Sequence, residues 1–212
     1  MTDQNKRELK PGQFNLQWIP IDWPLTPLGK NKDPYVKGWQ NQPFSVRDIE
    51  QELTTGECKA VGLLGGPVYN HPYGLVWVDI DGPTVYKAIE DLCGNSIEEA
   101  LPKTLTICSG KEGRERKLYK LKREQHKHFI RNKYTWHAEA PKEKLEILWK
   151  KHQGVLMGLH PDTQGYYTAK DQGFEYTDKL PDLPVWLMNA IINKNAKQGI
   201  PSNQHTRIVG PG

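Results

Sequence analysis

Residues 74–83 read Gly74-Leu75-Val76-Trp77-Val78-Asp79-Ile80-Asp81-Gly82-Pro83, a pattern typical of a buried strand that runs into a turn. Because side chains alternate between the two faces of a strand, we expect Asp79 and Asp81 to point the same way. Two carboxylates on one face at a strand end can bind a divalent cation, and a third ligand nearby would allow two ions. The alternative is a pair of solvated aspartates in a turn.

Length and composition indicate one globular domain. The chain has 212 residues, of which 36% are hydrophobic and 25% are charged, so it can bury a core beneath a polar surface. Its net charge of +4 is compatible with an anionic partner. No apolar run approaches the roughly 18 residues of a membrane span, and no signal peptide opens the chain. The three cysteines form no Cys-x-x-Cys pair, which disfavours a structural zinc site and favours a cytoplasmic location.

Basic residues are interleaved with aromatic residues between positions 29 and 39. Lys30, Lys32 and Lys37 share this segment with Tyr35 and Trp39. Such a pattern suits contacts with the phosphates and bases of a nucleic acid, although a solvated loop has the same composition.

A second basic segment follows the strand predicted for Thr104–Gly110. Arg114, Arg116 and Lys117 lie after Ser109 and Gly110, and such side chains form charge-assisted hydrogen bonds with phosphate oxygens. If Leu118 packs inward, Arg116 lies on the same face and Lys117 on the other, whereas a shift of one residue would exchange them. The alternative is an exposed hairpin.

The rest of the chain reads as short strands and helices. We expect helices at 46–54, 84–92 and Val185–Asn195, with Ser45 as an N-cap, and strands at 60–66, Lys144–Trp149, 154–159 and 165–168. Residues 122–144, which include His126, His128 and His137, are expected to be solvated. Glu146 stands among apolar residues, so it either faces solvent or binds another group.

The order of these motifs resembles the primase-polymerase domain of the archaeo-eukaryotic primase superfamily. In particular it is similar to the bifunctional modules at the N-terminus of plasmid and phage replication proteins, which often precede a helicase. The resemblance covers about residues 13–187 and is carried by Lys37-Gly38-Trp39, Val61-Gly62-Leu63-Leu64-Gly65-Gly66, Val78-Asp79-Ile80-Asp81-Gly82-Pro83, Ser109-Gly110 with its basic loop, Leu145-Glu146-Ile147, and Leu159-His160-Pro161 with Gly165-Tyr166-Tyr167.

The resemblance implies roles for individual residues. Asp79, Asp81 and Glu146 would be the catalytic ligands of two Mg²⁺ or Mn²⁺ ions. The family's Ser-x-His motif contacts the nucleotide, so Ser109 and Gly110 are expected to do so here, but the motif is incomplete because no histidine follows them. We therefore expect Arg116, supported by Arg114 or Lys117, to bind the triphosphate instead. His160 matches a His-Pro position of the family and would contact nucleotide or template.

The fold implied is α/β (α+β), with a mostly antiparallel sheet of the RNA-recognition-motif kind and an N-terminal αβ subdomain packed against it. We expect a flexible segment at 1–12, the catalytic domain at 13–187, and at 188–212 the end of the last helix and a linker to a further module. The resemblance implies a helicase as that module.

The predicted function is metal-dependent nucleotidyl transfer. The chain would act as a DNA primase or DNA polymerase that uses a DNA template, a primer and nucleoside triphosphates in the replication of a plasmid, a phage or a similar element. A metal-dependent nuclease and a non-catalytic nucleic-acid-binding module of the same fold are the alternatives. Since Asp79 and Asp81 would repel each other without metal, removing either is expected to leave the fold intact.

Overall fold

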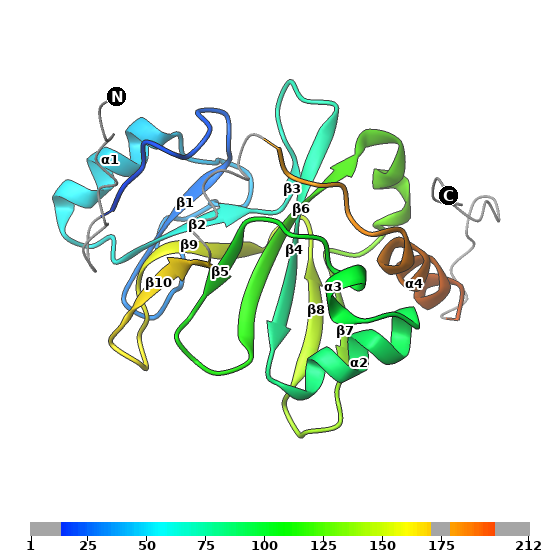
Figure 1. Cartoon of the computed structure of the whole chain (residues 1–212). Helices are drawn as coiled ribbons and strands as arrows, with labels where there is room; N and C mark the ends of the chain where they lie inside the picture. The colour runs from blue at the N-terminus through cyan, green and yellow to red at the C-terminus, as the bar shows by residue number, and fades with distance from the viewer. Residues whose placement is uncertain (1–13, 171–178, 198–212) are drawn as a thin grey trace, which may run out of the picture.

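The computed structural model describes residues 14–170 and 179–197 and shows one curled antiparallel sheet with helices at both ends (Figure 1). The sheet has ten strands in the order β1-β2-β9-β10-β5-β6-β4-β8-β7, with β3 beside β4. Every pair of named strands in this part of the chain is antiparallel. The predicted α/β fold class with a mostly antiparallel sheet is therefore confirmed.

The bounds of the elements follow the chain closely. The strands are β1 (Leu25–Leu28), β2 (Ala60–Leu64), β3 (Gly66–Pro67), β4 (Tyr73–Asp81), β5 (Thr106–Cys108), β6 (Arg114–Lys122), β7 (Lys133–His137), β8 (Lys144–Leu148), β9 (Gln153–Leu159) and β10 (Tyr166–Ala169). The helices are α1 (Val46–Thr55), α2 (Thr84–Cys93), α3 (Ile97–Ala100), the 3₁₀ helix η1 (Arg123–His128) and α4 (Val185–Ala196).

Strand β4 is buried on both faces, because a separate hydrophobic core lies on each side of it. Leu75 and Trp77 belong to the core shared with β1, β2 and β9. Val76, Val78 and Ile80 belong to the core beneath α2 and α4. This double burial explains the continuous apolar run in the sequence. By alternation, the two aspartates at the end of β4 continue the Leu75 and Trp77 side, away from the helices.

Local signals place the helices where the sequence predicts them. Ser45 and Asp48 form a capping box at the start of α1, and Gly56 ends it with a φ of 74°. The capping box provides hydrogen-bond acceptors for backbone N–H groups at the start of α1 that have no partner within the helix. Helix α2 begins directly after Pro83, as expected.

The expectation that residues 122–144 are solvated is only partly right, because most of them are exposed or half-buried but two are not. They form η1 and β7, and Phe129 and Tyr134 are buried in the core beneath the helices. His126 is half-buried, with its ring centroid 5.0 Å from that of Trp149 in an edge-to-face contact. Strand β1 also lies where the sequence predicts no strand. Strand β7 pairs with β8, and strand β1 pairs with β2. These pairings define the two strands, because neither has a sequence pattern that predicts it.

Some expectations fall outside the described residues. The flexible terminus predicted at 1–12 lies there, and so does 198–212, the greater part of the predicted linker. Within the described residues, none of the helices has the length and apolarity that crossing a membrane requires.

We predict that Gly154→Ala destabilises the fold, because the indole ring of Trp77 lies directly against Gly154. An added Cβ would lie 2.4 Å from the Trp77 ring. Overpacking of this kind costs about 1–3 kcal/mol of unfolding free energy. Urea denaturation checks this, with Gly165→Ala as the matched control, since the nearest atom to its added Cβ is 3.5 Å away. Equal midpoints for the two variants would contradict the prediction.

Candidate active site

The site begins where β4 leaves the hydrophobic core. Asp79 is directly opposite Arg116 on β6 and Glu146 on β8, and Asp81 is opposite Arg114 on β6. Residues directly opposite each other on antiparallel strands share a face of the sheet. The structure therefore places Asp79, Asp81 and Glu146 on one face of two neighbouring strands, with both arginines beside them.

Each aspartate is paired with an arginine of β6. Arg116 Nε donates to Asp79 Oδ1 at 2.8 Å, and Arg114 Nη1 lies 3.1 Å from Asp81 Oδ1. Burial alone would lower the pKa of the Arg116 guanidinium, but the Asp79 carboxylate outweighs burial and the pKa is raised. The expectation that the two aspartates simply repel each other is wrong, because each has a cationic partner.

Glu146 is buried, and three side chains contact its Oε1 atom. Only 8% of the residue is exposed, and its Oε1 lies 3.1 Å from Lys133 Nζ and 3.2 Å from Lys144 Nζ. Thr135 Oγ1 donates to the same oxygen at 3.1 Å. Burial would raise the pKa of this carboxyl group, but the two lysines outweigh it and the pKa is lowered. Of the two possibilities that the sequence left open, Glu146 binds other groups rather than facing solvent.

A small cleft of about 60 Å³ opens beside Asp79 and Asp81 on the β6 side. Its lining includes four of the predicted nucleotide-contacting residues and one residue predicted to bind nucleic acid: Ser109, Arg114, Arg116 and His160, and Lys32. Burial and the nearby Arg116 lower the pKa of the Lys32 ammonium. The cleft therefore combines two carboxylates with cationic groups, the composition that a metal-bound triphosphate requires.

Lys117 does not belong to this cleft. Leu118 is fully buried in the core on the Asp79 side, so Arg116 shares that face and the predicted register of β6 is confirmed. Lys117 points to the opposite face, where its Nζ lies 3.1 Å from Glu115 Oε1. There it lines a separate cavity of about 380 Å³.

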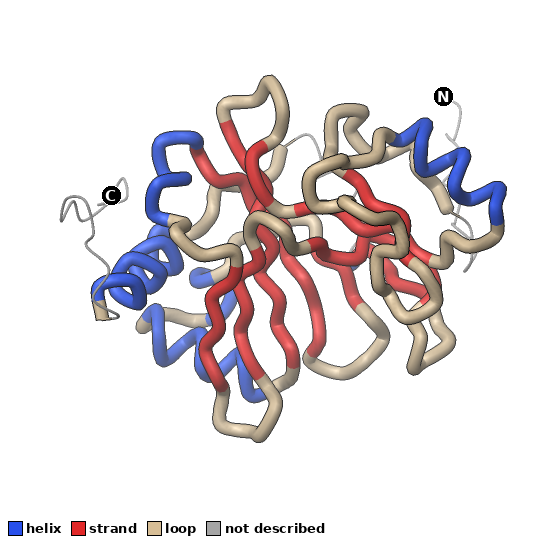
Figure 2. Tube along the Cα trace, turned by 180° about the vertical axis from the view of Figure 1, so that it is seen from behind, coloured by secondary structure: helices blue, strands red, loops and turns tan. Residues whose placement is uncertain are grey.

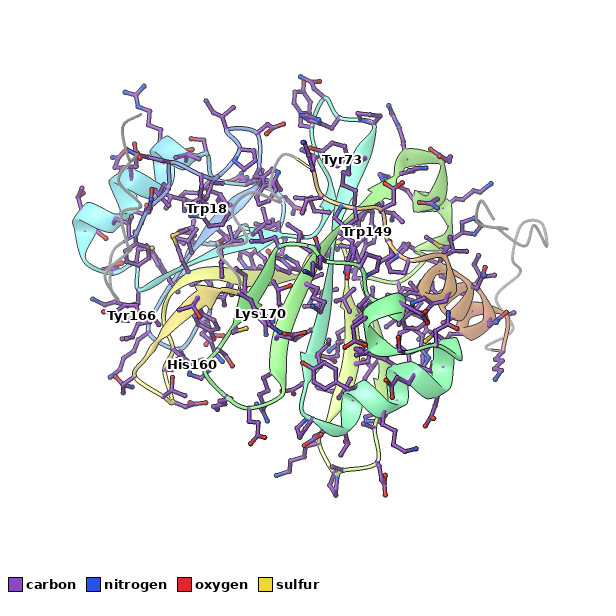
Figure 3. The ribbon with its side chains drawn as sticks, in the orientation of Figure 1. Trp18, Tyr73, Trp149, His160, Tyr166 and Lys170 are labelled. Atoms are coloured by element: carbon purple, nitrogen blue, oxygen red, sulfur yellow. The ribbon has the colours of Figure 1, made fainter. Side chains whose placement is uncertain are left out.

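His160 is held at the turn between β9 and β10 (Figure 3). Its Nδ1 accepts hydrogen bonds from the backbone N–H groups of Asp162 at 3.2 Å and Thr163 at 3.3 Å, which assigns the proton to Nε2. Burial, followed by the charge of Lys32, lowers the pKa of the imidazole. His160 is therefore a neutral hydrogen-bond donor at neutral pH.

Sequence reasoning missed two features of the cleft. Tyr167 lines it and its ring centroid lies 5.2 Å from that of His160, and burial raises the pKa of its phenol to about 12. Lys111 Nζ lies 2.6 Å from Asp162 Oδ2, which ties the β5–β6 loop to the β9–β10 turn. The Tyr166-Tyr167 pair was visible in the sequence as a motif, but its contact with His160 depends on the β9–β10 pairing.

The rest of the basic N-terminal segment lies apart from the cleft. Lys30 and Lys37 are exposed and Trp39 is half-buried, and none of these three lines the cleft. Gln153 Nε2 donates to the backbone carbonyl of Lys32 at 3.3 Å, so β9 holds Lys32, which lines the cleft together with Asp79 and Asp81. Gly110 also lies outside the cleft lining.

The carboxylates fit Mg²⁺ or Mn²⁺ in chemistry, because both ions prefer oxygen ligands. Within residues 14–170 and 179–197, no group of three His, Cys, Asp or Glu side chains is arranged closely enough to hold a metal ion. Each carboxylate instead contacts a basic side chain. Joint coordination would therefore require the carboxylates to turn away from these cations.

The comparison with protein families agrees with this geometry. A family described as "Bifunctional DNA primase/polymerase, N-terminal" matches residues 16–186. The chain therefore belongs to this family of primase/polymerase-type nucleotidyltransferases. A search of curated proteins found no match for it.

We predict that Asp79→Ala destabilises the protein, because it leaves the Arg116 guanidinium without its carboxylate. The side chains are 14% and 27% exposed, so solvent screens part of the loss, and we expect about 1–3 kcal/mol of unfolding free energy. Denaturant unfolding of Asp79→Ala, Arg116→Gln and the double variant measures the coupling between the two residues. Strictly additive losses would contradict a stabilising pair.

Proposed function

We propose that this chain is a DNA primase/polymerase that extends a primer on a DNA template with nucleoside triphosphates in the replication of a plasmid, phage or similar element. The observation that carries the proposal is the row of three carboxylates across β4 and β8, beside a cleft lined by Lys32, Arg114 and Arg116. Metal dependence is part of the proposal. A helicase module elsewhere in the full-length protein stays a prediction.

Asp79, Asp81 and Glu146 would hold the Mg²⁺ or Mn²⁺ ions. Bound there, two such ions would lower the pKa of a 3′-hydroxyl and would offset the negative charge of the triphosphate and of the leaving pyrophosphate. The protein's own groups bind and orient the nucleotide. Arg116 and Arg114 can move from carboxylate to phosphate oxygens, because a guanidinium binds both bidentately. His160 lines the same cleft, and its Nε2–H would donate a hydrogen bond to the nucleotide.

The cleft favours a polymerase over the two alternatives. A nuclease uses the same carboxylates but needs no basic pocket for a triphosphate. The cleft beside Asp79 is basic, because Lys32, Arg114 and Arg116 line it. A binding module that has lost catalysis has no need for three acids on one face of the sheet.

We predict that Asp79→Asn, Asp81→Asn and Glu146→Gln each abolish nucleotide incorporation, because each removes a charged metal ligand while keeping the side-chain shape. The assay combines a labelled primer on a template, ribo- or deoxynucleoside triphosphates, and Mg²⁺ or Mn²⁺. Longer products with the parent protein support the proposal.

Shortened products from the parent protein would favour the nuclease, and retained binding without any product would favour the binding module. Lys87→Gln, on the exposed surface of α2, is the control for substitution as such. Full incorporation by the Asp79 variant would remove the metal-site interpretation.

We predict that Arg116→Gln raises the KM for nucleotide by roughly tenfold or more, because a charge-assisted hydrogen bond contributes about 1.5–3 kcal/mol. The matched variant is Lys117→Gln, one residue further along β6, whose side chain lies on the opposite face. Steady-state kinetics with saturating primer–template separates the two. If only Lys117→Gln raised the KM, the triphosphate would bind on the opposite face of the sheet and the proposed role of Arg116 would be wrong.

A further inference from the structure

The sheet face that carries the carboxylates extends beyond them onto β8 and β7. On this face lie Lys144 and Glu146 of β8 and Lys133 and Thr135 of β7, as their shared contacts with the Glu146 carboxylate show. Figure 2 shows these strands with the helices behind them, so the helix layer leaves this face uncovered. This uncovered face begins at Asp79, so a substrate that reacts at Asp79 can also contact β8 and β7.

The chemistry of this face is cationic. The side chains of Lys133 and Lys144 are 42% and 32% exposed, and both ammonium groups lie on a single carboxylate oxygen of Glu146. One carboxylate shared by two ammonium groups leaves a local excess of positive charge. His137, two residues after Thr135 on β7, is exposed at the end of the same row. Exposed lysines on an open face match the backbone phosphates of a nucleic acid strand.

The position of the cleft indicates which strand of the nucleic acid, primer or template, binds to this face of the sheet. The cleft with Arg116 lies on the β6 side of Asp79, whereas Lys144 and Lys133 lie on the β8 and β7 side. With strands spaced about 4.8 Å apart, these lysines stand roughly 5 and 10 Å across the sheet from Asp79. In phosphoryl transfer the attacking and leaving oxygens are nearly in line on opposite sides of the phosphorus. If the triphosphate binds in the cleft on the β6 side, the attacking 3′-hydroxyl must therefore approach from the β8 side.

We propose that the primer strand crosses the open face of β8 and β7, with Lys144 and Lys133 binding its backbone phosphates next to the reacting end. This rests on the proposed function, because it assumes that the triphosphate occupies the cleft beside Arg116. It differs from the sequence-based expectation, which assigned nucleic-acid binding to the segment with Lys30 and Lys37. Those two lysines are exposed outside the cleft lining and serve as the competing surface in the test.

The experiment measures binding of the full chain to a fluorescent primer–template without metal or nucleotide, so it does not depend on catalysis. Anisotropy titrations between about 50 and 200 mM salt give the slope of log affinity against log salt. Lys133→Gln and Lys144→Gln are tested singly, because each leaves Glu146 with the other lysine and Thr135 and so preserves the fold. Lys87→Gln is the control for removal of an exposed lysine on the helix side.

We expect Lys133→Gln and Lys144→Gln each to weaken binding and to reduce the salt slope by about 0.7 to 0.9, the value for one phosphate contact. The matched Lys→Arg variants should restore the slope. The proposal is overturned if both glutamine variants match Lys87→Gln while a Lys30→Gln/Lys37→Gln variant loses affinity.

A photoreactive base at the primer 3′-end adds a positional measurement. Crosslinks to a peptide within residues 133–146 support the proposal, and crosslinks confined to residues 29–39 overturn it. If the protein binds the primer through Lys133 and Lys144 yet incorporates no nucleotide with any metal, the proposed polymerase function fails while the location of the nucleic-acid surface stands.

Discussion

The contact between Asp79 and Arg116 is the constraint on which the rest of the site depends. Asp79 lies near the end of β4, a strand that is buried on both faces, where an unpaired carboxylate would be costly. The guanidinium offsets that cost, and it is available only because β4 and β6 pair in one register. A slip of one residue would send Arg116 to the helix side and bring Lys117 to Asp79. Trp77 and Leu118, packed in the same core, prevent such a slip.

The same arrangement recurs across the sheet, where Arg114 pairs with Asp81 and two lysines pair with Glu146. Without metal, these pairs keep a concentration of like charge from opposing the compact state. The basic partners are also the groups that a phosphate would attract. In the proposed function, a carboxylate that binds metal releases its cationic partner toward the substrate, so that one set of side chains serves both the folded protein and the reaction.

Local rules made much of the fold predictable from the sequence. Strand alternation indicated the common face of Asp79 and Asp81, the Ser45 capping box marked the start of α1, and a buried Leu118 fixed the orientation of Arg116. What could not be predicted depends on contacts between distant segments. Lys32 reaches the cleft from the N-terminal loop. Strand β7 alternates polar with aromatic side chains, and its polar residues masked a strand that forms by pairing with β8.

No histidine follows Ser109-Gly110, where the resemblance implies a Ser-x-His motif, and the proposed function divides the task of that histidine between two other residues. His160 is at the cleft, but burial and the charge of Lys32 lower the pKa of its imidazole, so it does not supply positive charge at neutral pH. Arg116 can supply it, because Asp79 raises the pKa of its guanidinium despite burial. In the proposed function, hydrogen-bond donation and positive charge, which a protonated histidine would combine, are divided between His160 at the β9–β10 turn and Arg116 on β6. The charge that faces the nucleotide then does not change with pH in the range where a histidine titrates.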